Sequence, residues 1–168
     1  MKKHWKYLMY VLRHKWYVMI ECFKMGLFWR GLVHDISKFL PLEWTPYTWS
    51  FYGPWRYNER PNFLCKKFDY AWLHHQKCNK HHWQYWVLQN DSDGVRELEI
   101  PDVYIMEMLA DWKGAGRAQG HESPRNDPWK ETREWFNGQA GNMKVHPESL
   151  LRIEKFLLET GYDWKKKL

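Results

Sequence analysis

Two helical patterns separated by one glycine occupy the first forty residues, and they constrain the fold more than any other feature of the chain. The patterns run over about residues 3–25 and 28–39, and Gly26 lies between them. Glycine often ends a helix because it adopts left-handed backbone angles without a steric penalty. We therefore expect two helices that pack against each other as an αα-hairpin.

Helical signals continue through the rest of the chain, and they set the predicted fold class. Further helices are expected over about residues 62–79, 101–113, 128–137 and 147–160, with a short one near 81–86. Extended residues are expected only in a short stretch, 95–100, after a turn at 90–94. The sequence thus predicts an all-α protein, a compact helical bundle that forms a single domain over residues 1–168.

Two segments carry residues that disfavour helices. Residues 41–61 are rich in proline and aromatic residues, and they predict an ordered, aromatic-packed loop. Gly114, Ala115 and Gly116 predict the end of the helix before them. The glycine, serine, proline and asparagine content of residues 114–127 then predicts a mobile loop.

The composition narrows the kind of protein. Aromatic residues make up 18% of the chain, which gives it enough apolar area to fold as a globular domain. The three cysteines are odd in number and show no CxxC spacing, so we expect no disulfide framework and a cytoplasmic protein. Charged side chains interrupt the apolar stretch 8–32, which therefore predicts neither a signal peptide nor a membrane span.

The net charge of +6 is a weaker guide, because part of it lies in chain ends such as the lysines at 165–167. A positive balance favours anionic partners such as nucleotides or nucleic acid. The alternative is that these lysines form solvated ends that aid solubility.

Four side chains make a candidate metal site. His14 lies within the first predicted helix, and His34 and Asp35 are adjacent in the second. The αα-hairpin would bring His14 beside His34, and Asp111 lies on a later helix. Imidazole and carboxylate donors on separate helices suit a catalytic divalent cation with open coordination positions.

In their order along the chain, these residues resemble the HD-domain superfamily of metal-dependent phosphohydrolases. The superfamily pattern is a His, then His-Asp on the following helix, then an Asp on a later helix. His14, His34, Asp35 and Asp111 match that order, and the string His34-Asp35-Ile36-Ser37-Lys38 is similar to the HD-x-x-K element. The resemblance implies a metal-dependent hydrolase with an HD-like helical fold.

The resemblance also implies a second metal ion, bound by further histidines. His74-His75 and His81-His82 are similar to the additional histidines of HD proteins that hold two ions. Neighbouring residues of a helix point about 100° apart, so one histidine of each pair is expected to face the site. We favour His75 and His82.

Over nearly its full length, the chain also resembles a small uncharacterised family found in bacteria and phages. The strings that carry this likeness are HD-x-SKF, AWLHHQ followed by NKHHWQYW, EMLADW-x-GAGRAQG and HPES. That family has no established activity, so this second resemblance implies little about function.

The residue types around the predicted centre suggest roles in phosphoester hydrolysis. Lys38 and Arg117 are candidates to bind phosphate, Arg117 through a two-pronged contact. Asp111 or Glu107 would orient the attacking water, and Trp83 is a candidate to stack on a base. Mn, Fe, Co, Ni, Mg or Zn are the divalent ions considered, one or two per chain. These assignments predict hydrolysis of a nucleotide or a related phosphate ester.

Several alternatives remain open at this point. One is a phosphodiesterase acting on cyclic nucleotides or nucleic-acid ends, which in a phage would serve against a host defence. Another is a non-catalytic binding protein in which the metal only staples helices. A structural zinc site on Cys78 and His82, with Cys65, is a further alternative, although the spacing is imperfect. Glu107 could equally be a carboxylate on the helix surface. The aromatic residues have the helical spacing of core residues, which is the alternative to stacking on a ligand.

Overall fold

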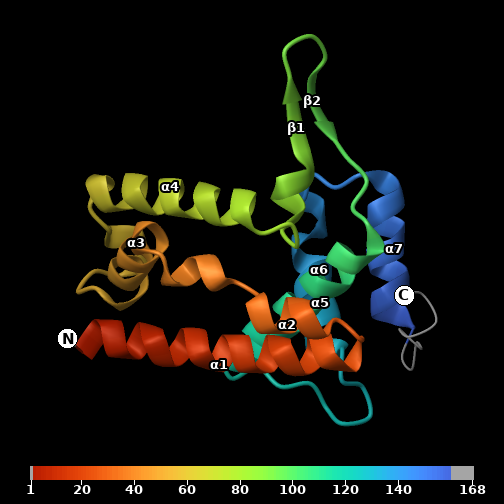
Figure 1. The fold of residues 1–168 in the computed structure, drawn as a ribbon, viewed down its shortest axis with the longest axis horizontal. Helices are drawn as coiled ribbons and strands as arrows, with labels where there is room; N and C mark the ends of the chain where they lie inside the picture. Colours follow the sequence, from red (N-terminus) through yellow and green to blue (C-terminus); the bar gives the residue numbers. More distant parts are fainter. Residues whose placement is uncertain (1, 160–168) are drawn as a thin grey trace.

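Seven α-helices account for most of residues 2–159, the part of the chain that the computed structural model describes (Figure 1). The all-α prediction is confirmed: the sheet found in this part is one two-stranded hairpin. The lysines at 165–167 and the end of the last predicted helix lie outside the described residues. The elements, in chain order, are α1 (Lys2–Lys24), α2 (Phe28–Val33), α3 (Pro41–Tyr52), α4 (Asn62–Cys78), β1 (Val87–Asn90), β2 (Gly94–Glu97), α5 (Asp102–Ala118), α6 (Lys130–Gln139) and α7 (Pro147–Leu158).

The predicted αα-hairpin is present, but its second helix is shorter than expected. Gly26 has a φ of 79° and turns the chain between α1 and α2, which pack together. The prediction of a helix over 28–39 is wrong beyond Val33. There Asp35 adopts left-handed angles (φ 53°, ψ 29°), and a 3₁₀ turn, Ile36–Phe39, follows.

The prediction of a loop over residues 41–61 is also wrong, because α3 occupies its first half. Pro41 is the first residue of α3, where the missing N–H group would have no intrahelical partner in any case. Pro46 lies inside the helix and removes one hydrogen bond. Aromatic packing offsets that loss: the Trp44 and Tyr47 rings of α3 lie 4.8 and 6.2 Å from the ring of Tyr7 on α1.

Helix α5 packs mainly on α1 and continues through the glycines that were expected to end it. A Cβ atom on Gly114 would lie 2.5 Å from Val18 Cγ2 and 2.9 Å from the Val18 backbone nitrogen. Gly114 therefore permits close approach of the two helices and does not terminate α5. Residues 114–118 of the predicted loop are helical.

Two hydrophobic clusters lie at the two ends of α1. One gathers Val18 and Cys22 with apolar residues of α5, α6 and α7, and the other gathers Tyr7 and Val11 with residues of α3 and α4. His14 lies between Val11 and Val18 on the same buried face. The boundary between the clusters is therefore the place where α1 buries a polar side chain.

The hairpin β1–β2 projects beyond the helices (Figure 1). Its antiparallel register runs from the Val87–Glu97 pair to the Asn90–Gly94 pair, so the turn falls where it was predicted. No helix within residues 2–159 has the length and apolar character needed to cross a membrane.

Candidate metal centre

Asp35 lies at the centre of a buried polar cluster. It is the one residue other than glycine with positive φ in residues 2–159, and its side chain is 0% exposed. The break after α2 turns this carboxylate inward, between α1 and α5. Lys38 donates from Nζ to Asp35 Oδ2 at 2.5 Å, and the ammonium group of Lys15 donates to the carbonyl of His34.

The four residues predicted to bind the first ion meet at Asp35 Oδ2. His14 Nε2 lies 3.2 Å from Asp35 Oδ2 and 3.1 Å from Asp111 Oδ1. His34 Nε2 lies 3.4 Å from Asp35 Oδ2 and 3.3 Å from Asp111 Oδ1. All four residues are buried, and their donor atoms lie within 4.8 Å of one another. We call this set the first donor group.

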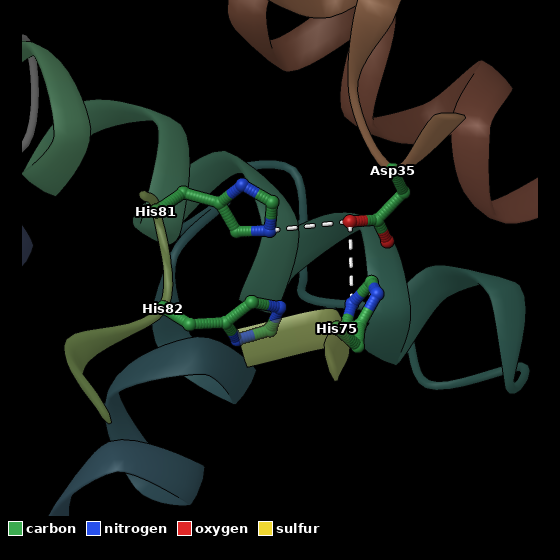
Figure 2. Close-up of side chains that lie close together, drawn as sticks. All are labelled: Asp35, His75, His81 and His82. Carbon is green, nitrogen blue, oxygen red and sulfur yellow. Dashed lines mark ion pairs between the residues drawn. The ribbon is translucent and has the colours of Figure 1, made fainter. Parts of the chain in front are cut away.

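A second donor group forms on the other oxygen of Asp35 (Figure 2). His75 Nε2 and His81 Nε2 lie 3.4 and 3.3 Å from Asp35 Oδ1. His82 completes the group, in which the donor atoms of the four residues lie within 4.8 Å of one another. In Figure 2 the three imidazoles and the carboxylate point toward a common space. The Asp35 carboxylate is thus shared by the two groups.

Several of these atoms are buried without a hydrogen-bond partner in the described part of the chain. They are the Nε2 atoms of His34, His75, His81 and His82, together with Asp35 Oδ1. Buried polar atoms are rarely left unpaired, because each loses its interactions with water. Five such atoms in one place fit lone pairs directed at a cation.

Two further carboxylates hold the imidazoles in orientation. Glu107 Oε1 lies 3.2 Å from His34 Nδ1 and 3.3 Å from His81 Nδ1, while Glu107 Oε2 accepts from Arg30 at 2.9 Å. Glu43 Oε2 lies 2.8 Å from His75 Nδ1. A carboxylate on Nδ1 fixes the ring and directs Nε2 to the opposite side, as is common around metal-binding histidines.

The electrostatics favour ionised carboxylates. Burial alone would raise the pKa of Asp35, but His34, Lys38 and His75 outweigh it and hold the pKa well below the ordinary value. Asp111 behaves in the same way, because the adjacent His14 and His34 rings oppose the effect of burial and lower its pKa. Both carboxylates therefore remain negatively charged near neutral pH.

The pKa values of the imidazoles are shifted in different directions. Burial would lower the pKa of His34, but the charge of Asp35 and the adjacent carboxylates of Asp111 and Glu107 raise it. The pKa of His82 falls well below its ordinary value because of burial and the nearby His81 and His75. His82 is therefore neutral at pH 7, the state in which an imidazole offers a lone pair.

The structure brings together His14, His34, Asp35 and Asp111, and it places His75 and His82 with Asp35. It corrects one expectation: His81 and His82 both face the site, although one of the two was expected to point away. Residues 79–82 form a turn between α4 and the next 3₁₀ segment, so the helical angle between neighbours does not apply. The half-buried His74 lies outside both groups, with Nδ1 2.6 Å from Glu43 Oε1.

The residues predicted to act on substrate have other surroundings. Both oxygens of Glu107 are engaged by His34, His81 and Arg30, and its side chain is buried, so Glu107 is not a surface carboxylate and is placed to position imidazoles. Lys38 is 13% exposed in its side chain and paired with Asp35. Arg117 pairs with Glu21 in a different cavity, described below.

A cavity of about 300 Å³ opens beside the two donor groups. Asp111, His82 and Trp83 contribute to its lining. The remaining lining residues are tryptophans, amides and methionines: Trp72, Gln84, Met108, Trp112, Trp135, Gln139, Asn142 and Met143. No lysine or arginine is among the lining residues found in the described chain.

Cysteine takes no part in the candidate metal groups found in residues 2–159. Cys78 Sγ lies 3.4 Å from His74 Nε2, and His74 belongs to neither donor group. A structural zinc site built on Cys78 and His82 is therefore not what the fold assembles.

The site is thus a buried centre of histidine and carboxylate donors, shared between α1, the α2–α3 connection, α4 and its following turn, and α5. Residues 3–159 match a family of unknown function (DUF5662), and the chain belongs to that family. No curated protein and no solved structure matches the chain.

Proposed function

We propose that this chain is a divalent-metal-dependent phosphohydrolase of the HD type that cleaves a phosphate ester, with a nucleotide as the favoured substrate. One observation carries the proposal: unpaired buried donors converge on both oxygens of Asp35, beside a cavity with aromatic and amide walls. The resemblance of His14, His34, Asp35 and Asp111 to the HD pattern supports the same reaction class.

Two ions would share Asp35. The first would be held by His14, His34, Asp35 and Asp111, and the second by Asp35, His75, His81 and His82. A divalent ion in such a site lowers the pKa of bound water and neutralises phosphoryl oxygens. Imidazole and carboxylate together suit Mn²⁺, Fe²⁺, Co²⁺, Ni²⁺, Zn²⁺ and, less well, Mg²⁺.

The chain's own side chains would then bind and orient the substrate. Asp111 and His82 belong both to the donor groups and to the cavity wall, so a phosphate at that wall would lie next to the centre. The rings of Trp83 and Trp112 offer flat apolar surfaces for a base, and the amide of Gln84 offers a donor and an acceptor. The remaining amides of this wall would add further hydrogen bonds.

The size and charge of the cavity favour a small monoester. About 300 Å³ is at the lower end of ligand-binding cavities. Since none of its described lining residues is a lysine or arginine, charge on the phosphate would be balanced at the metal centre. A nucleoside monophosphate, whose single phosphate could sit at that centre, fits these features better than a nucleic-acid chain.

Product analysis tests the proposal. The protein would be incubated with Mn²⁺, Co²⁺, Ni²⁺ or Mg²⁺ and with nucleoside monophosphates, cyclic nucleotides or short oligonucleotides. We expect the protein to release inorganic phosphate from a nucleoside monophosphate, and the Asp35→Asn variant to release none. Cleavage of only cyclic or oligomeric substrates would make the chain a phosphodiesterase, and metal-dependent melting without turnover of any substrate would make the centre a structural staple.

A further inference from the structure

A second buried charged cluster lies two helical turns along α1 from the candidate metal centre. Glu21 follows His14 by seven residues, which places it about 10 Å further along the helix axis and on nearly the same face. Its side chain is buried, yet it lines a cavity of about 330 Å³ between α1, α5 and the segment that leads into α6. None of the residues proposed to bind metal lines this cavity.

Three cationic side chains surround the one carboxylate of Glu21. Lys24 Nζ lies 2.9 Å from Oε1, Lys113 Nζ lies 3.0 Å from Oε2, and an Arg117 guanidinium nitrogen lies 3.3 Å from Oε1. Together the ammonium and guanidinium groups carry more N–H donors than one carboxylate can accept. The cluster therefore has an excess of positive charge and of hydrogen-bond donors.

Aromatic rings hold two of these cations in place. Lys113 Nζ lies 4.1 Å from the centroid of the Trp129 ring, and Arg117 Cζ lies 4.2 Å from that of Tyr17. Such contacts fix a cation over the face of a ring. Burial lowers the pKa of Lys113, with smaller contributions from the charges of Lys24 and Arg117, although the Glu21 charge opposes this.

The segment opposite adds another cation and a hydroxyl group. Arg125 lines the cavity, is exposed, and has no ion pair among the described residues, and Ser123 lies beside it. The lining contains two other carboxylates, Glu131 and Glu122. Glu131 Oε1 lies 3.2 Å from His121 Nδ1, and Glu122 is exposed.

We propose that this cavity is an anion site that binds a phosphate dianion, either free or as a small phosphomonoester. Lys113 and Arg117 would bind its oxygens from the α5 side, Lys24 from α1, and Arg125 from the opposite wall. Glu21 would hold the α1 and α5 cations in position, and the four cations of the lining outnumber its three carboxylates, Glu21, Glu122 and Glu131, which leaves a net positive charge for the anion. The site is separate from the metal centre and does not depend on the hydrolase proposal.

Calorimetric titration of the full-length protein with inorganic phosphate, and in a second arm with methyl phosphate, tests the proposal. We expect one equivalent to bind, and the same binding to Asp35→Asn, which removes the carboxylate shared by the metal groups. Preference between the two probes distinguishes a site for free phosphate from one for a monoester. Absence of binding of both probes would refute the anion site, as would binding that is lost in Asp35→Asn.

Substitutions in the lining locate the bound anion. Lys113→Met should weaken binding at least tenfold, and Arg125→Gln, whose exposed side chain can be replaced without disturbing the fold, should weaken it severalfold. Lys130→Gln removes an equal charge from the exposed start of α6, outside the cavity lining, and should leave the affinity unchanged. If Lys113→Met fails to fold, Arg125→Gln decides: an affinity equal to that of Lys130→Gln would overturn the assignment.

Discussion

The candidate metal centre and the Glu21 cluster are both buried ionic groups between α1 and α5, but they are unbalanced in opposite senses. At the centre, Asp35 and Asp111 are ionised, Lys38 pairs with Asp35, and several imidazole nitrogens have no hydrogen-bond partner. Around Glu21, three cations share one carboxylate. We propose that a cation completes the first cluster and an anion the second.

The comparison shows that burial of charge alone does not indicate function. A buried ion pair contributes little net stability, because loss of solvation offsets the attraction between its partners. What distinguishes each cluster is the kind of atom left unmatched. At Asp35 these are acceptors and imidazole nitrogens, whereas around Glu21 they are N–H donors.

The largest effect is expected for Asp35→Asn, which should abolish binding at both donor groups. Both oxygens of Asp35 face donor atoms, and asparagine retains the shape of the side chain and tolerates left-handed backbone angles. Bound metal after Mn²⁺ or Ni²⁺ loading would be measured by elemental analysis, and helicity by circular dichroism. A metal content equal to that of the unsubstituted protein, with helicity retained, would remove both assignments.

His75→Ala should remove one ion and leave the other. His75 belongs to the second donor group and takes no part in the first, so the stoichiometry should fall from two to one. His74→Ala is the matched control, since it deletes the adjacent histidine, which contacts Glu43 and lies outside both groups. Equal metal loss in the two variants would mean that the second group is not a metal site.

Glu107→Gln should weaken metal binding by roughly 10- to 100-fold, the range found when a carboxylate that orients a metal-binding histidine is replaced. The substitution removes the charge on Nδ1 of both His34 and His81 but leaves every proposed ligand in place. Titration with a competing chelator would measure the affinity. An unchanged affinity would show that Glu107 serves only to anchor Arg30.

The sequence was sufficient to predict the first donor group, because four ligands of suitable type occurred in order on separate helical patterns. It failed where local geometry departs from a regular helix. His81 joins the site because residues 79–82 form a turn, and the α2 helix stops so that Asp35 can turn inward. Neither backbone feature has a recognisable local signal.

Tertiary packing explains the other differences from the sequence predictions. Glu43 was missed as a partner of His75 because its segment was interpreted as a proline-rich loop, whereas aromatic contacts with Tyr7 support a helix there. Gly114 resembled a helix end, but its role is visible only when Val18 of α1 is seen against it. The Glu21 cluster was missed for the same reason: Arg117 was predicted to bind phosphate, and its ion pair with Glu21 is visible only once α1 and α5 are packed together.

The smallest effect is expected at Lys24, and it tests how the charge around Glu21 is distributed. The Lys24 side chain is 61% exposed, against 10% for that of Lys113, although both lie about 3 Å from the same carboxylate. Solvent screens an exposed pair, so Lys24→Gln should change the free energy of unfolding by no more than about 0.5 kcal/mol. Lys113→Met removes a buried charged hydrogen bond and should cost roughly 1.5–3 kcal/mol. Urea denaturation of both variants, without metal or phosphate, would measure the difference. Equal losses of unfolding free energy would contradict the view that the buried Lys113 of α5 stabilises Glu21 more than the exposed Lys24 does.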